Sequence, residues 1–175
     1  MRAIAIALIL AVSATTARAD EDPIAQAMTL EAQLQYEPAL AIIERTIAQG
    51  GADHDRLVTL HQFAGRLAAG LGRATVAEDH FARVLALDPD SKFAAGTSPK
   101  ITEPFERARG RTAPLRISSI VEPDAITIVP DADPLGLVAG IAIKLDDGRE
   151  LREMQTRRVA IPPGKGATEV FALDT

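Results

Sequence analysis

The chain has 175 residues, 47% of them hydrophobic and 3% aromatic, with a formal net charge of −5 and no cysteine. This length and hydrophobic content allow one domain or two small ones, and the acidity disfavours nucleic acid as a partner, because phosphate binding needs a basic face. The lack of cysteine excludes disulfides and thiolate chemistry, and the scarcity of aromatic residues argues against a stacking platform for sugars or single strands.

The first nineteen residues predict a secretory signal peptide. They carry a positive charge at Arg2, an apolar run from Ile4 to Val12, and a small-x-small ending around Arg18. We expect cleavage between Ala19 and Asp20, which removes two arginines and leaves a net charge of −7. The apolar run is shorter than the roughly 20 residues of a transmembrane helix, and no cysteine can accept a lipid. The sequence therefore predicts an exported protein, periplasmic or secreted, without a membrane segment or lipid anchor.

Residues 20–110 predict a helical domain, because apolar residues recur there at helical spacing. Four helices are expected: the first from Pro23 to about Leu34, and the second from about Glu37. Capping and breaking residues stand at the expected boundaries: Asp22-Pro23, Gly50-Gly51, Asp53, Gly70 with Gly72, and Asp88-Pro89. A fifth helix is predicted after Ser98-Pro99, with Ile101, Phe105 and Ala108 on its inner stripe. We expect it to cover the apolar edge of the preceding helices.

Residues 113–175 predict a small β-domain, so that the whole chain is α+β. The expected strands are Leu115 to Val121, Ala125 to Val129, Val138 to Leu145, Glu150 to Met154, Arg158 to Ile161 and Glu169 to Leu173. Asp146-Asp147-Gly148 is typical of a hairpin turn. An immunoglobulin-like or fibronectin-like sandwich is expected. About 60 residues is lean for such a sandwich, so one edge is expected to depend on the helical domain or on a partner, and the completeness of the sheet at Thr175 stays open.

The stretch from Asp55 to Pro89 resembles a tetratricopeptide repeat. Five positions carry the resemblance: the small residue of the first helix, the turn, and the small, aromatic and proline positions of the second helix, at Gly65, Gly72, Ala77, Phe81 and Pro89. His61, Ala68 and Val84 depart from the pattern. Residues 22–54 resemble a weaker first repeat. The segment around residues 88–109 is similar to the junction of bacterial envelope tetratricopeptide proteins that continue into a small β-domain.

Candidate metal and nucleotide sites are weak. His54 and His61 share a helical face but stand about 10 Å apart, too far to chelate one ion alone. Asp131 and Asp133 lack the remaining ligands of a calcium loop, and residues 163–168 lack the glycine and hydroxyl positions of a phosphate loop. These segments are interpreted as a helix start, an acidic turn and a strand-connecting loop, and no cofactor is expected.

Catalytic motifs are also missing, because the sequence has no Gly-x-Ser-x-Gly and no thiol nucleophile. Ser98 and Lys100 belong to a helix start, and paired carboxylates such as Glu78-Asp79 point in different directions on a helix. The sequence therefore predicts a protein that is not an enzyme. Four arginines gather at the domain junction, where they either receive an acidic partner or, as we favour, pair with Glu103, Glu106 and Glu122: Arg107, Arg109, Arg111 and Arg116.

The leading hypothesis is an exported interaction module, an adaptor or accessory subunit of a cell-envelope complex. The family resemblance implies that first helices line a peptide-binding surface, which points to these partner contacts: Leu30, Leu34, His61, Gly65 and Ala68. Edge pairing by the last strand would strengthen a complex, so Leu173→Pro is expected to weaken it. The alternative is a structural envelope component that forms a homo-oligomer or binds envelope polymer through the β-domain.

Overall fold

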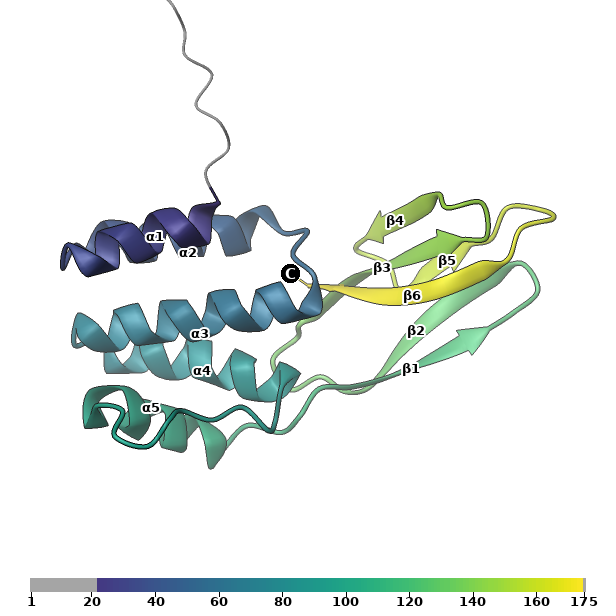
Figure 1. Ribbon diagram of the computed structural model, residues 1–175. Coiled ribbons are helices and arrows are strands. Elements are labelled where there is room, and N and C mark those ends of the chain that lie inside the picture. The colour runs from purple at the N-terminus through teal and green to yellow at the C-terminus, as the bar shows by residue number, and fades with distance from the viewer. Residues whose placement is uncertain (1–21, 175) are drawn as a thin grey trace, which may run out of the picture.

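A computed structural model describes residues 22–174 of the protein, which is α+β: five helices precede two antiparallel three-stranded sheets (Figure 1). The helices gather at one end and the strands project from the other. The predicted signal peptide, residues 1–19, and Thr175 lie outside the described residues. Within residues 22–174 no helix is long and apolar enough to cross a bilayer.

The five helices are α1 (Pro23–Ala32), α2 (Tyr36–Gln49), α3 (His54–Gly70), α4 (Ala74–Leu87) and α5 (Pro99–Arg109). Three of the five helices, α1, α3 and α5, begin directly after a predicted capping residue, whereas α2 and α4 begin after Gln35 and Arg73, which make no side-chain capping hydrogen bond. The Asp22 carboxylate accepts the amide N–H of Ile24, and that of Asp53 accepts the amide of Arg56 at 2.8 Å. Both caps satisfy backbone donors that an α-helix leaves free at its start. Ser98 stands at the cap of α5, but its side chain makes no capping hydrogen bond.

α1 ends at Ala32, so Leu34 lies in the following turn and not on the helix as predicted. Leu34 has a φ of 60°, and the amides of Leu34 and Gln35 donate to the carbonyls of Glu31 and Leu30. This is a Schellman end, whose left-handed position is usually glycine. α3 ends in the same way, with Gly72 in that position at φ 75°. Because a leucine and not a glycine occupies the left-handed position after α1, the sequence gives no signal for the end of this helix.

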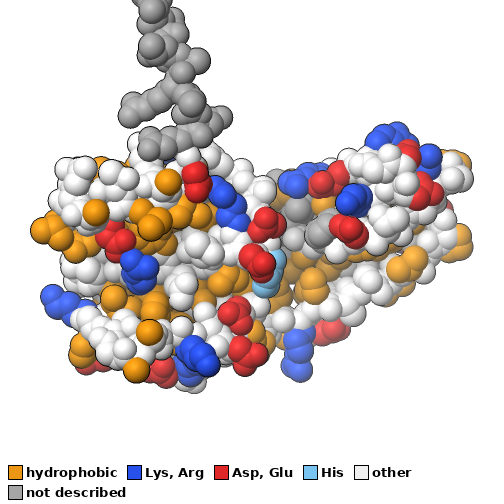
Figure 2. All heavy atoms as spheres, in the orientation of Figure 1, with side chains coloured by type: hydrophobic (Ala, Val, Ile, Leu, Met, Phe, Trp, Pro, Cys, Tyr) orange, Lys and Arg blue, Asp and Glu red, His pale blue; other side chains and the backbone are white. Residues whose placement is uncertain are grey.

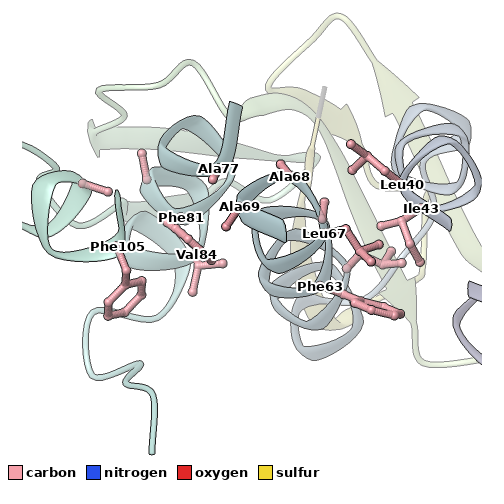
Figure 3. Packing of buried hydrophobic residues seen from close by; sticks show 14 of the residues in the cluster. Leu40, Ile43, Phe63, Leu67, Ala68, Ala69, Ala77, Phe81, Val84 and Phe105 are labelled. Carbon is pink, nitrogen blue, oxygen red and sulfur yellow. The ribbon is translucent and has the colours of Figure 1, made fainter. Parts of the chain in front are cut away.

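Successive helices pack against one another, and α3 lies between α2 and α4 (Figure 3). Figure 3 shows Leu40 and Ile43 of α2 on one side of α3, and Ala77 and Phe81 of α4 on the other. An aromatic cluster continues this core: Phe81 lies 5.4 Å from Phe105 and 5.5 Å from Phe93 between ring centroids, with edge-to-face geometry. Phe105 is 1% exposed, so α5 covers the open side of α4.

Gly65→Ala is expected to destabilise the chain by about 2 kcal/mol, because overpacking costs up to about 3 kcal/mol and the better helix propensity of alanine returns about 1. A Cβ at position 65 would stand 2.4 Å from Cε1 of Phe81, which is fully buried. Gly70→Ala is the matched control, since its Cβ would meet Tyr36 at an ordinary 3.7 Å. Urea denaturation of both variants measures the difference. Equal stability of the two would contradict the tight Gly65–Phe81 contact.

The strands form two sheets that face one another. One sheet has the order β1–β2–β5 and the other β4–β3–β6. The bounds are β1 (Arg116–Val121), β2 (Ala125–Ala132), β3 (Val138–Leu145), β4 (Glu150–Met154), β5 (Arg158–Ala160) and β6 (Ala167–Asp174). The shared core contains Ile126, Ile128 and Val159 from the first sheet and Val138, Ile141, Ile143 and Leu145 from the second. The β3–β4 turn has Gly148 at φ 83°, as the Asp-Gly signal predicts.

The two sheets part at one side. β5 contacts β3 and β4, and β2 contacts β3, which leaves β1 on the side of β6. Ile117, Ser119 and Val121 share a face of the sheet with the core residues of β2, because Ser119 pairs with Ile128 and Val121 with Ile126. Yet every residue of β1 is exposed. The core-directed face of β1 is therefore left uncovered by the second sheet.

Candidate partner-binding cleft between the domains

A cleft of about 700 Å³ opens where the helical domain (residues 22–110) meets the β-domain (residues 113–174). Apolar side chains from both domains form its walls: Leu57, Leu87, Leu115, Ile117, Leu137, Val138, Ala142, Val170 and Ala172. Polar residues stand at its margin: Asp53, His54, Asp55, Glu150 and Arg152. Figure 2 shows hydrophobic side chains in this hollow, with acidic side chains and a histidine beside it.

The helical side of the cleft is formed by the turn between α2 and α3 and by the end of α4. Gly50 and Gly51 have φ values of 68° and 79°, which turn the chain sharply toward the Asp53 cap of α3. At the end of α4, the Ala86 carbonyl accepts the Leu115 amide at 2.8 Å, a backbone hydrogen bond that links the two domains. The C-terminal end of β6 lies at the same junction (Figure 1).

The β side of the cleft depends on the acidic turn at residues 131–136. The Asp133 carboxylate accepts the amides of Leu137 at 2.7 Å and Val138 at 3.0 Å. These bonds fix the start of β3, so that both apolar residues are buried and line the cleft. The Asp133 carboxylate thus has a structural role in this turn, which comparison with a calcium loop did not reveal.

The margin of the cleft is acidic. Asp53, Asp55 and Glu150 face one cation, Arg152, and Arg152 is ion-paired with Glu150, two residues earlier on β4. The ion pair neutralises that cation, so the two aspartates beside the start of α3 dominate the local field. An apolar segment with basic flanking residues fits these walls and this margin best.

The predicted partner contacts do not form one surface. Leu30 is half-buried against the helical core, and Leu34 is 74% exposed in the turn after α1. His61, Gly65 and Ala68 are buried within α3 and expose almost no side-chain surface. The physical reason is the central place of α3, which is covered by α2 on one side and by α4 on the other.

His61 instead meets His80, a residue that sequence analysis did not single out. Their Nδ1 atoms are 3.1 Å apart, so one neutral ring donates its proton to the other. The pair borders a hollow of about 390 Å³ between α2, α3 and α4, with Glu44, Asp79 and Arg83 around it. Both histidines lie two to three turns from the α3–α4 loop. Folding the predicted helical hairpin at that loop therefore places them side by side, which is the signal that could have identified His80 from the sequence.

Burial keeps this histidine pair uncharged. Desolvation, then the charge on His80 and that on Arg83, lower the pKa of His61 to about 3. Desolvation and Arg83 likewise lower the pKa of His80 to about 4, although Asp79 acts in the opposite direction. His61 Nε2 is buried without a hydrogen-bond partner among the described residues. Near neutral pH the pair is a polar packing contact inside the helical domain.

The other candidate residues have structural roles. His54 is exposed at the start of α3 and does not meet His61, and residues 22–174 hold no group of three metal-ligating side chains. In the loop at residues 163–168, Lys165 pairs with Asp147 of the β3–β4 turn at 3.0 Å. The hydrogen bond from the Arg149 backbone amide, and after it that from Lys165, lower the pKa of Asp147 to about 2.

The arginine cluster pairs mainly within the helical domain. Arg107 and Arg111 both bind Glu78 of α4, at 3.2 and 2.8 Å. Arg109 pairs with Glu106 as expected, at 3.4 Å, and donates to the Ser91 carbonyl. The predicted pairing with Glu122 across the domains is wrong for these three, because Glu122 binds Arg158 of β5. Arg116 is exposed at the start of β1.

Comparisons with known proteins add no relative: no protein-family model, no curated protein and no solved structure matches this chain.

Proposed function

We propose that the chain is an exported, non-enzymatic interaction protein, an adaptor or accessory subunit of a cell-envelope complex, and that it binds its partner in the interdomain cleft. The observation that carries the proposal is the cleft itself: apolar walls from two domains, an acidic margin, and an adjoining strand whose core-directed face is uncovered. Its volume falls within the roughly 300–1,000 Å³ of sites that hold small ligands. It therefore accepts a few side chains of an extended segment and not a whole helix.

The helical domain supports the interaction class. The tight packing of Gly65 against Phe81 and the full burial of Ala77 support the tetratricopeptide interpretation of residues 55–89. Repeats of that kind commonly present peptide-binding surfaces. In this chain the predicted groove residues of α3 are buried, so the proposal assigns recognition to the cleft at the end of the helices.

The β-domain and the N-terminal sequence support the remaining parts of the proposal. Two facing three-stranded sheets suit a small immunoglobulin-like sandwich that lacks full cover on one side. The signal-like residues 1–19 support export to the periplasm or beyond.

Site-specific photo-crosslinking in cells tests the cleft. A photo-crosslinking residue in place of His54, at the margin, is expected to capture one defined envelope protein, whereas the same residue in place of Lys100, exposed at the start of α5, is not. Ala172→Trp, which fills the cleft from β6, is expected to reduce the capture at position 54 at least fivefold without lowering the melting temperature. Equal capture at both positions, or capture that Ala172→Trp leaves unchanged, would remove the cleft from the proposal.

A further inference from the structure

β1 is an edge strand with a free row of backbone groups. The Glu122 amide donates to the Ala125 carbonyl at 2.8 Å, and from there to Ile117 the strands β1 and β2 pair in continuous antiparallel register; the register shifts between Ile117 and Arg116. The backbone N–H and C=O groups of successive residues point to opposite sides of such a strand. Since Glu122 bonds to the β2 side, the even-numbered residues of β1 also bond to β2. The N–H and C=O groups of Ile117, Ser119 and Val121 consequently point away from β2, where no other described strand pairs with them.

The usual protection of a sheet edge is missing from β1. Proteins guard edges with charges, proline or very short strands. β4 carries Glu150, Arg152 and Glu153, and β5 is only three residues long. β1 has no charge or proline from residue 117 to 121, and its large side chains are exposed: Ile117 by 45%, Ile120 by 54% and Val121 by 69%.

The sequence of β1 complements itself in one antiparallel register. A two-fold axis at Ser119 places Ile117 of each copy opposite Val121 of the other, on the face that the second sheet leaves uncovered. It also places Arg116 of each copy opposite Glu122 of the other, with one such pair at each end. The three outward residues then meet one another as hydrogen-bonded pairs. Cross-strand apolar pairs and opposite charges of this kind stabilise sheets.

Neighbouring registers lack this match. An axis at Ser118 sets Arg116 opposite Ile120 and moves Glu122 beyond the paired segment. An axis at Ile120 sets Ile117 opposite Pro123, which has no N–H to donate. Backbone alternation excludes axes between residues, since opposed side chains must share a face. Of the three registers, centred on Ser118, Ser119 and Ile120, only the one centred on Ser119 combines apolar pairs with two pairs of opposite charge.

We infer that this chain forms a two-fold homodimer in which β1 pairs antiparallel with β1 of a second copy, centred on Ser119. The two β1–β2–β5 sheets become one continuous six-stranded sheet. Because β1 starts at the helical domain, the antiparallel pairing sends the two helical domains to opposite ends of the dimer. The paired edge shares Ile117 with the β side of the cleft but uses none of its helix-side walls, so the dimer goes beyond the proposed function and does not require a partner in the cleft.

Sedimentation equilibrium of the full chain tests the dimer. We expect a dimer at micromolar concentration, and Ser119→Pro is expected to raise the dissociation constant at least tenfold. The proline removes an outward N–H that β2 does not use, so the melting temperature of the monomer is expected to stay close to that of the parent. Capture through the cleft at position 54 is expected to persist, which separates this result from the proposed function.

A charge variant gives an independent result if Ser119→Pro fails to fold. Arg116→Glu sets two acidic residues opposite each other at both ends of the paired strands, and we expect it to weaken the dimer at least fivefold. Arg157→Glu makes the same charge change at an exposed position before β5 and is expected to leave the dimer unchanged. A parent chain that stays monomeric at 100 micromolar, or a dimer that neither Ser119→Pro nor Arg116→Glu weakens, would overturn the inference.

Discussion

Lowering the pH from 7 to 4.5 is expected to reduce the free energy of unfolding by on the order of 4 kcal/mol through His61 and His80 alone. Both side chains are largely buried, and their pKa values in the folded chain are about 3 and about 4, below the ordinary value of 6.5. The unfolded chain therefore binds two protons that the folded chain does not, between pH 6.5 and about 4. Stability is retained above pH 6.5 and falls as the pH decreases through that window.

The groups around the pair set the size of this effect. Arg83 of α4 opposes protonation of both rings, whereas Asp79 favours it, and Glu44 of α2 lies 3.8 Å from His80 Nε2. Burial outweighs the two carboxylates, because Glu44 and Asp79 are about half exposed or more, whereas the His80 side chain is 13% exposed and His61 is 2% exposed.

Urea denaturation at several pH values between 4.5 and 7 measures the loss. His80→Gln keeps a hydrogen-bonding partner for His61 but removes one titrating ring, so it is expected to reduce the pH dependence by about half. His54→Gln is the control, since that side chain is exposed in the folded chain. Comparing variants cancels the contribution of carboxylates. If His80→Gln keeps the full pH dependence of the parent chain, the buried pair is not its source.

Phe105→Ala is expected to cost about 4 kcal/mol of stability, within the range for large aromatic residues removed from a core. Phe105 is 1% exposed and makes edge-to-face contacts with Phe81 and Phe93, at centroid distances of 5.4 and 4.9 Å. Its ring attaches α5 to α4. The truncation leaves a cavity that the remaining rings cannot fill without losing their own contacts, and we expect α5 to detach first.

Thermal and urea denaturation measure this loss, and limited proteolysis within residues 88–98 reports the detachment of α5. Phe93→Ala is the graded comparison, because Phe93 is only half-buried and is expected to cost clearly less. Lys100→Ala is exposed and is expected to change stability by less than about 0.5 kcal/mol. A loss below about 1 kcal/mol for Phe105→Ala would mean that α5 is held mainly by the Arg107–Glu78 ion pair and not by the aromatic contacts.

Local chemistry made several boundaries predictable. Asp22-Pro23 and Asp53 start helices because their carboxylates accept free backbone amides, and Asp147-Gly148 turns the chain because glycine takes a positive φ at little cost. The end of α1 was missed because Leu34 occupies a left-handed position without glycine. The successes and the failure have the same cause. A sequence predicts a backbone conformation only where that conformation strongly favours one residue type, such as glycine at a positive φ.

β2 continues past its predicted end at Val129 to Ala132 and includes Pro130. The amide of Ile128 donates to the Arg157 carbonyl before β5, so a residue two positions later points in the same direction. β5 pairs only with residues 125–127, and position 130 therefore has no partner strand that needs its N–H. The proline is tolerated there because a neighbouring strand is short, which sequence alone could not indicate.

Composition, hydrophobic periodicity and capping residues were enough to predict an α+β chain with helices first and strands second, because these depend on neighbours within a few residues. Which side chains remain accessible was decided only by tertiary packing. Periodicity marked one apolar face of α3, but two helices cover it, so His61, Gly65 and Ala68 became core. The cleft and the open edge of β1 arise where two domains and two sheets meet at angles that no local pattern encodes.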